Sequence, residues 1–344
     1  EDDPFRQLDE LLPTSNAERT ASGAPGTGYW QQRADYDIAV TLDDKKQRIQ
    51  GEATINYSNR SRHTLEYLWV QLEQNRFEPD SDAHAVQTAP KFEDGSSYKR
   101  MENILQLADS DGGFKISSVT DADGNDLDHT IGGTMMRIEP PAALESGDEI
   151  EFQIHWEYHI VDAKKIRARG GYEYFEEDKN YIYEIAQWFP RMAAYTDYTG
   201  WQHKQFLGRG EFALEFGDYE VAITVPADHV VAATGELQNA DEVLSDDQRK
   251  RLRQAEDVEN PMFIITPEEA KANEKSRSEK QKTWIFHAEN VRDFSWASSR
   301  KFIWDAQLHE QESGGPVWAM SYYPNEAEPL WSKYSTHAII HTLE

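Results

Sequence analysis

Hydrophobic and polar residues alternate with a period of two over much of the chain. The first clear case covers residues 36–42, and it resumes over residues 49–57 after a polar turn at residues 43–46. Successive side chains of a β-strand point to opposite faces, so this pattern is typical of strands with one buried face. Two such runs joined by a short polar turn predict an antiparallel hairpin.

The same alternation recurs along the chain. Its clearest instance comprises Ile150, Phe152, Ile154, Trp156, Tyr158 and Ile160. Further strands are expected at residues 65–72, 114–119, 181–186, 211–216, 219–225 and 283–287. Gly and Asp turns separate the strands and few helices intervene, which favours antiparallel sheets over βαβ units. The sequence therefore predicts a mainly β fold, with one large antiparallel β domain over residues 29–312.

Two short helices are expected between strands as surface insertions. Ser245 can cap a basic helix that ends near Arg253, and Thr266 can cap a second helix with Pro267 in its first turn. A hydroxyl at the cap and acidic residues in the first turn both stabilise a helix N-terminus.

The pattern changes near Gly314. Residues 317–322 have the composition of a buried strand, and a helix is expected from Asn325 to Glu344. Its apolar side is predicted to contain Leu330, Trp331, Tyr334, Ala338 and His341. We expect residues 313–344 to be the truncated start of a second, α/β domain that is mostly missing.

Residues 1–28 are expected to form a flexible N-terminal segment. They are polar and end in a stretch rich in Gly, Ser, Thr and Pro, a composition that favours an extended linker. The chain starts with neither Met nor an apolar leader, so the start is expected to be a processed or trimmed end.

The composition is that of a folded, acidic protein. Of its 344 residues 38% are hydrophobic, which suffices for a core, and the formal net charge is −28. A field of that sign repels phosphate, so nucleic-acid and anionic membrane partners are not expected. The chain has no Cys, hence no disulfide and no thiolate metal site. No membrane span is expected, and we expect a bacterial periplasmic or secreted location, with a cytoplasmic one left open.

Some residues have the spacing of metal ligands. His337 and His341 lie one helical turn apart, but Ala338 stands where a metalloprotease needs its general-base Glu, so ordinary surface histidines are the favoured interpretation. His155 and His159 lie too far apart on a strand to share one metal. Residues 121–126 resemble a calcium loop, but a turn between strands explains them better. We expect no metal ligand in this chain.

Several stretches together resemble the aminopeptidase N-like gluzincin family of zinc metallopeptidases. The likeness covers most of residues 29–344 in order. Residues 29–36 with the following hairpin resemble the opening strands of the family's saddle-shaped β domain. Residues 208–212, 216–226 and 233–237 resemble the later strands of that domain, and residues 292–306 resemble its closing segment. Residues 317–344 would match the first strand and helix of the thermolysin-like catalytic domain.

The resemblance implies a function for a longer protein. It implies zinc-dependent removal of the N-terminal residue from peptides, with a zinc-bound water as nucleophile and a Glu as general base. The family's His-Glu-x-x-His helix has no counterpart here, and Met101-Glu102-Asn103 matches its Gly-x-Met-Glu-Asn strand only by coincidence, in the wrong domain. We therefore expect this chain alone to be inactive, and to need its missing catalytic domain as a partner.

The resemblance also implies one substrate contact. The family's β domain directs a Gln or Glu, placed shortly before a Phe-Pro turn, toward the substrate's amino end. Phe189-Pro190 supplies the turn here, and Glu184 or Gln187 is the candidate residue. The alternative is that both are ordinary strand residues.

A second functional hypothesis is a binding or scaffold module without enzymatic activity. In this interpretation exposed aromatic side chains such as Trp188 and Trp201 would contact peptides or glycans.

Overall fold

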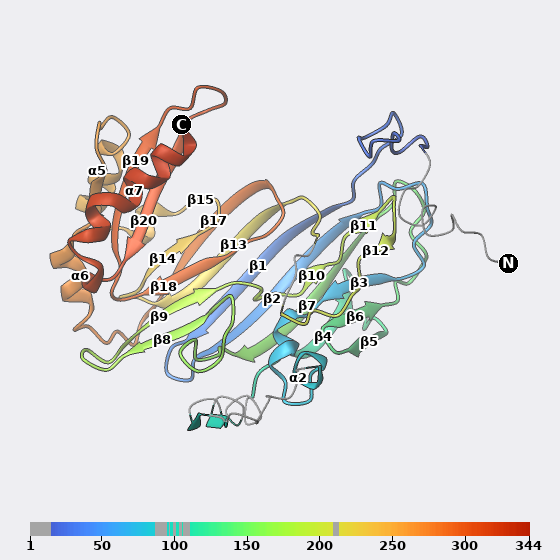
Figure 1. Ribbon diagram of the computed structural model, residues 1–344, viewed down its shortest axis with the longest axis horizontal. Coiled ribbons are helices and arrows are strands. Elements are labelled where there is room, and N and C mark those ends of the chain that lie inside the picture. The colour runs from blue at the N-terminus through green and yellow to red at the C-terminus, as the bar shows by residue number, and fades with distance from the viewer. Residues whose placement is uncertain are drawn as a thin grey trace.

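The computed structural model describes residues 15–86, 95, 97–98, 101–102, 105, 111–208 and 213–344. Its largest sheet has seven strands in the order β15-β17-β13-β1-β2-β7-β4 and runs through the middle of the molecule (Figure 1). The bounds of these strands are β15 Glu236–Leu237, β17 Gln281–Val291, β13 Gly217–Pro226, β1 Arg33–Asp43, β2 Arg48–Ser58, β7 Glu149–His159 and β4 Lys115–Asp121. The mainly β fold predicted from the sequence is confirmed.

The predicted hairpin is formed by β1 and β2. They pair antiparallel from Arg33↔Ser58 to Asp43↔Arg48, and buried and more exposed positions alternate along β1. The buried set includes Ile38 and Ile55, both fully shielded from solvent. Alternation therefore sets which face of the sheet enters the core.

One pairing of the large sheet departs from the antiparallel expectation. β13 lies parallel to β1, with Tyr36↔Tyr219 and Thr41↔Thr224 in register. Parallel neighbours need a long crossover connection, and here the chain between β2 and β13 supplies it. The strand expected at residues 211–216 falls partly outside the described residues, and Phe216 forms only an isolated bridge with Arg33.

Two smaller sheets contribute to the same core as the large sheet. One has the order β10-β3-β6-β5 and the other β14-β18-β9-β8, and residues of both belong to one hydrophobic cluster with those of the large sheet. The strands of the first sheet are β10 (Arg191–Met192), β3 (Leu68–Gln71), β6 (Met135–Ile138) and β5 (His129–Gly132). Those of the second sheet are β14 (Val230–Ala233), β18 (Trp296–Ser299), β9 (Asn180–Ile185) and β8 (Gly171–Phe175). β11 (Tyr195–Thr196) and β12 (Gly200–Trp201) form a short hairpin, and β3 leads into the 3-10 helix η1 (Glu73–Phe77) and then α2 (Asp82–Ala85).

Both predicted helix caps are present. Ser245 and Thr266 cap α5 (Asp246–Gln254) and α6 (Pro267–Asn273), each in a reciprocal capping box. Such a box satisfies two backbone groups that a helix start otherwise leaves unpaired. With α4 (Ala240–Val243) and β16 (Met262–Ile265), these helices form an insertion between β15 and β17.

The last part of the chain joins a three-stranded sheet. β19 (Ile303–His309) pairs with β16 on one side and with β20 (Val317–Tyr323) on the other. The boundary expected after residue 312 therefore falls in the connection between two paired strands. No helix among the described residues is long and apolar enough to cross a membrane.

The last helix differs from the prediction in its start and its orientation. Residues Asn325–Ala327 form a separate 3-10 turn, η2, and α7 begins after Pro329, at Leu330. Its buried residue is Thr336, whereas Leu330, Trp331 and Tyr334 are 60%, 47% and 62% exposed. The predicted apolar side thus faces outward, because the strands beneath present polar groups to the helix.

Those polar groups are on β19 and β20. The Thr336 hydroxyl bonds to the carboxylate of Asp305 and, at 2.7 Å, to Ser321, which also contacts Ser335 at 2.9 Å. A buried polar group costs free energy unless it is hydrogen-bonded, so the helix turns its hydroxyls toward Asp305.

The described part of the N-terminal segment, residues 15–28, makes contacts within itself and with a distant part of the chain. Its chain turns back on itself in a bridge between Arg19 and Pro25, and Arg19 forms an ion pair of 2.7 Å with Asp197. The Arg19 guanidinium also lies 5.2 Å above the Tyr29 ring. The ion pair attaches the segment to the β11–β12 hairpin, 178 positions away in sequence.

Candidate functional site

The turn between β9 and β10 has the most unusual backbone among the sequence-predicted site residues. β9 ends at Ile185, and Gln187 two residues later has φ of 54°. This left-handed region is rarely adopted by a residue with a side chain and costs of order 1–3 kcal/mol. Such strain persists only where neighbouring contacts fix the backbone.

Three side-chain hydrogen bonds provide that fixation. Gln74 of η1 donates to the Gln187 carbonyl at 2.9 Å, and Trp156 of β7 donates to the Trp188 carbonyl at 3.1 Å. The Trp188 indole in turn donates to the Phe294 carbonyl at 2.8 Å. The turn is therefore attached to η1, to β7 and to the segment between β17 and β18.

The two candidate contact residues lie in different environments. Glu184 is an exposed residue in the body of β9, paired with Gly171 and Ala297. Gln187 is 6% exposed, and its Nε2 is buried without a hydrogen-bond partner. An unsatisfied buried amide costs about 1–3 kcal/mol, so this side chain has hydrogen-bonding capacity that the described chain leaves unused.

A buried ion cluster lies immediately after the turn. Arg191 is 1% exposed and forms ion pairs with Glu73, which is equally buried, and at 2.6 Å with Asp293. Burial by itself lowers the pKa of Arg191, but the attraction of the two carboxylates outweighs it and raises that pKa. Since Glu73 and Gln74 are neighbours, one short helix fixes both the ion cluster and the strained turn.

The described residues contain one cluster with the spacing of metal ligands, and a lysine fills it. Asp178, Glu274 and Glu326 bring carboxylate oxygens within 4.8 Å of one another. The fully buried Lys301 ammonium pairs with all three, at 2.8 Å from Glu326 and 3.4 Å from Glu274, and lies 4.7 Å from the Phe175 ring centre. This arrangement is a structural ion cluster.

The other residues with the spacing of metal ligands lie on the surface helix α7 and in the turn at residues 121–126. His337 and His341 are exposed on α7, with His341 near Glu344 at 3.6 Å. Residues 121–126 form a turn in which the Asp121 carboxylate accepts backbone hydrogen bonds, and the side-chain hydrogen bond from Asn125 is the largest cause that lowers its pKa. Met101-Glu102-Asn103 lies partly outside the described residues.

The second hypothesis needs Trp188 and Trp201 to be exposed, and the structure shows both of them buried. Trp188 is fully buried and Trp201 is 9% exposed. Trp188 packs edge-on against Phe189 and Trp296, with ring centres at 4.9 and 6.1 Å. Large aromatic side chains next to a Phe-Pro turn are core anchors here and offer no contact surface.

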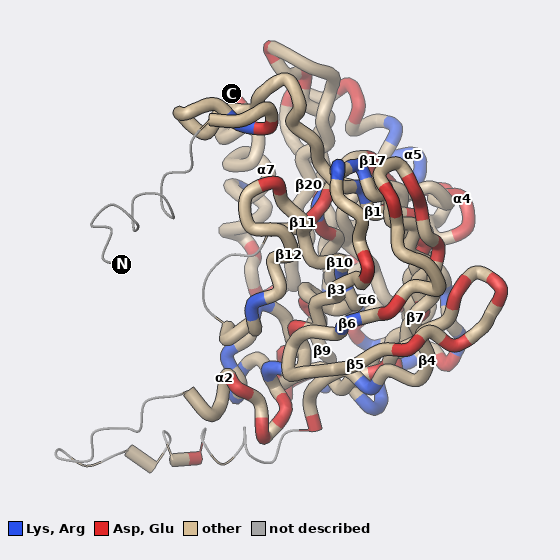
Figure 2. The backbone as a smooth tube through the Cα atoms, turned by 90° about the vertical axis from the view of Figure 1, so that its right-hand side faces the viewer, with Lys and Arg blue, Asp and Glu red and all other residues tan. Residues whose placement is uncertain are grey.

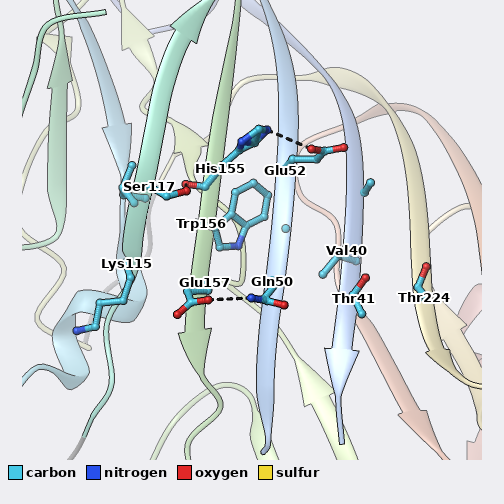
Figure 3. A pocket seen from close by; sticks show the side chains of 13 residues that line it. Val40, Thr41, Gln50, Glu52, Lys115, Ser117, His155, Trp156, Glu157 and Thr224 are labelled. Atoms are coloured by element: carbon cyan, nitrogen blue, oxygen red, sulfur yellow. Dashed lines mark hydrogen bonds and ion pairs between the residues drawn. The ribbon is translucent and has the colours of Figure 1, made fainter. Parts of the chain in front are cut away.

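An open hollow of about 470 Å³ lies on the large sheet (Figure 3). Its polar side chains pair with one another: His155 with Glu52 at 3.1 Å, and Gln50 with Glu157 at 2.9 Å. Figure 2 shows short stretches of Asp and Glu over most parts of the backbone, with Lys and Arg among them, so charge gives no further indication of a ligand.

Two buried ion clusters could not be found from the sequence. Arg191 lies 118 residues from Glu73 and 102 from Asp293. Lys301 and Asp178 are 123 residues apart. Residues so far apart carry no local spacing signal, and only the sheet topology brings them together.

Comparison with known proteins yields structural neighbours only. No family model and no curated protein sequence matches the chain. Among solved structures it is similar to the M1 zinc metallopeptidase from Deinococcus radiodurans, with 10% identity, 88% of this chain and 49% of that chain covered, and a TM-score of 0.44. A mutant of that enzyme bound to a Tyr-Ser-Ala substrate matches at 11% identity, 92% and 54% coverage, and a TM-score of 0.47.

The structural neighbours are M1 zinc metallopeptidases. A two-domain M1 zinc metallopeptidase mutant bound to L-tryptophan matches at 10% identity, 92% and 54% coverage, and a TM-score of 0.47. The chain spans about half the length of these neighbours, from 49% to 54%.

Proposed function

We propose that this chain is the N-terminal, non-catalytic part of a zinc aminopeptidase, and that its Gln187 contacts the amino end of a peptide substrate. The observation that carries the proposal is the turn before Phe189-Pro190. There Gln187 is buried and held in a left-handed backbone conformation by contacts from other elements. The sequence resemblance to the aminopeptidase N-like family predicts a substrate contact at this place.

Of the two candidates, Gln187 is favoured over Glu184. A residue that orients a substrate must itself be held in place, since loosely held groups bind with a loss of entropy. Gln187 is buried and its carbonyl is anchored by Gln74, whereas Glu184 is exposed on a regular strand. In this role the Gln187 amide oxygen would accept a hydrogen bond from the substrate's ammonium group.

The exposed side of α7 supports docking of a further domain. Leu330, Trp331 and Tyr334 lie outward on this helix, while Thr336 is buried against β19 and β20. Burying apolar surface stabilises by about 25 cal/mol per Å², so an apolar helix side in water favours a partner. In this proposal the partner is the catalytic domain of the longer protein.

Zinc is assigned to that catalytic domain. The only described group of three His, Cys, Asp or Glu side chains that converge is occupied by Lys301, so these residues do not fit a zinc site. When bound in its own domain, zinc would lower the pKa of a water and polarise the scissile carbonyl. The contribution of this chain is substrate positioning.

Kinetics of the longer protein test the proposal. Gln187→Gly removes the side chain and relieves the left-handed strain, so the variant is expected to fold at least as well as wild type. We expect its KM for a peptide substrate to rise about 10-fold, in line with loss of one hydrogen bond to a charged group. Glu184→Ala is the matched control and is expected to leave KM within about twofold. A KM that rises with Glu184→Ala and not with Gln187→Gly would contradict the assignment.

A further inference from the structure

The Lys301 ion cluster connects the strand that leads to the Gln187 turn with the segment that leads to α7. Its three carboxylates come from three parts of the chain: Asp178 precedes β9, Glu274 follows α6, and Glu326 lies in η2. β9 ends two residues before Gln187, and η2 ends shortly before α7 begins. A single ammonium group therefore contacts both segments.

The charge of Lys301 is maintained although the side chain is fully buried. Burial lowers the pKa of Lys301, but the hydrogen bonds to Asp178 and Glu326 and the charge of Glu274 outweigh this effect and raise that pKa. An ammonium group has three N–H donors, which equals the number of its carboxylate partners. The three segments are thus attracted to one fixed point.

A second hydrogen bond reinforces the contact with η2. Asn325 Nδ2 donates to Oε1 of Glu274 at 3.0 Å, and the same oxygen lies 3.4 Å from Lys301 Nζ. The backbone carbonyl of Glu274 accepts a hydrogen bond of 2.9 Å from Asn180, the first residue of β9. The η2 segment is therefore joined to the start of β9 by two routes, one through Lys301 and one through Glu274.

β9 and β18 extend together from this cluster to the Gln187 turn. Figure 1 shows the two strands side by side, and they pair antiparallel with Trp296 opposite Ile185. Lys301 follows the last residue of β18 by two positions, and Trp296, its first residue, packs edge-on against Trp188 with ring centres at 6.1 Å. The paired strands fix the distance from cluster to turn, which is about 17 Å along β9 at roughly 3.4 Å per residue.

We propose that Lys301 and Glu326 are positioning residues, which hold the Gln187 turn at a set distance from α7. This inference rests on the proposed function, in which Gln187 contacts the amino end of the peptide and α7 belongs to the part that hydrolyses it. Both parts must then be placed correctly relative to one substrate, and a misplacement of 1 Å can cost about 100-fold in such an arrangement. Neither Lys301 nor Glu326 contacts the substrate in this role.

A double-mutant cycle in the longer protein tests the proposal. Glu326 is 50% exposed, so Glu326→Ala removes the partner of Lys301 on the solvent side and is expected to fold. We expect its KM for a peptide substrate to rise about fivefold, less than the roughly 10-fold expected for Gln187→Gly, because a misplaced Gln187 binds the amino end less well. In the Gln187→Gly background the same substitution is expected to change KM by less than about twofold, because the side chain that it misplaces is absent.

The matched control is Glu312→Ala. Glu312 is exposed in the β19–β20 connection, and we expect KM to be unchanged in both backgrounds. An equal rise of KM with Glu326→Ala in both backgrounds would show that Glu326 acts independently of Gln187. That result, or an unchanged KM in Glu326→Ala, would overturn the positioning role and leave the contact by Gln187 intact. A KM unchanged by Gln187→Gly alone would overturn the proposed contact, and this inference with it.

Discussion

At the residue scale, buried charges show most directly how this acidic chain is held together. Lys301 lies at the centre of three carboxylates, and Arg191 joins two. A buried charge that loses its partner is far more costly than an exposed one, because it can no longer be solvated. Glu215 is a different case: it is 8% exposed, and its carboxylate accepts a hydrogen bond from the Tyr195 backbone N–H at 2.8 Å.

Removal of the Lys301 charge should destabilise the chain strongly. Lys301→Met leaves three carboxylates without their cation, and we expect the free energy of unfolding to fall by about 3–5 kcal/mol. Lys275 follows Glu274 in the sequence and is exposed, so Lys275→Met is expected to change the free energy of unfolding by less than about 0.5 kcal/mol. Urea denaturation of both variants measures the difference, and equal effects would refute the structural role of the cluster.

Glu215 should make stability depend on pH. Burial raises the pKa of Glu215 from 4.5 to about 7, so the folded state binds its proton more tightly than the unfolded state. Its stabilising contribution is fully present below pH 4.5 and is lost as pH rises through about 7. In Glu215→Gln we expect the part of this loss due to Glu215, on the order of 3 kcal/mol, to disappear. Parallel pH profiles of unfolding free energy for wild type and variant would contradict this.

At the element scale, the sequence pattern predicted those elements whose stabilising contacts lie between residues close together in the chain. The β1–β2 hairpin and the capped helices α5 and α6 need only neighbouring residues, and all three are confirmed. The outward side of α7 could not be predicted, because the polar partners of Thr336 belong to β19 and β20. The left-handed turn at Gln187 is fixed by η1 and β7, and therefore left no signal in the residues around it.

Gly51 of β2 is an element-scale position at which a single methyl group should matter. An added Cβ would lie 2.5 Å from the Trp156 ring on the paired strand β7, closer than carbon atoms can approach. Gly51→Ala is expected to cost about 1–3 kcal/mol, as overpacking does. Gly132→Ala on β5 is the control, since a Cβ there meets nothing within 4 Å. Thermal unfolding that is unchanged in Gly51→Ala would contradict the register of β2 and β7.

At the scale of the whole molecule, the described residues form five sheets, and the helix α7 carries exposed apolar side chains. The order of strands in the large sheet, including the parallel β1–β13 pair, depends on residues such as Asp35 and Asp218, which are 183 positions apart. No period in the sequence encodes that pairing. The division of labour that we propose, with positioning here and hydrolysis elsewhere, is a statement about the longer protein.

The most direct measurement compares peptide hydrolysis by the natural longer protein and by the 344-residue chain, each before and after chelation of metal. We expect the longer protein to release N-terminal residues, to stop when zinc is removed and to resume when zinc is restored, while the 344-residue chain releases none. Metal-dependent turnover by the 344-residue chain, or its absence from the longer protein, would contradict the account.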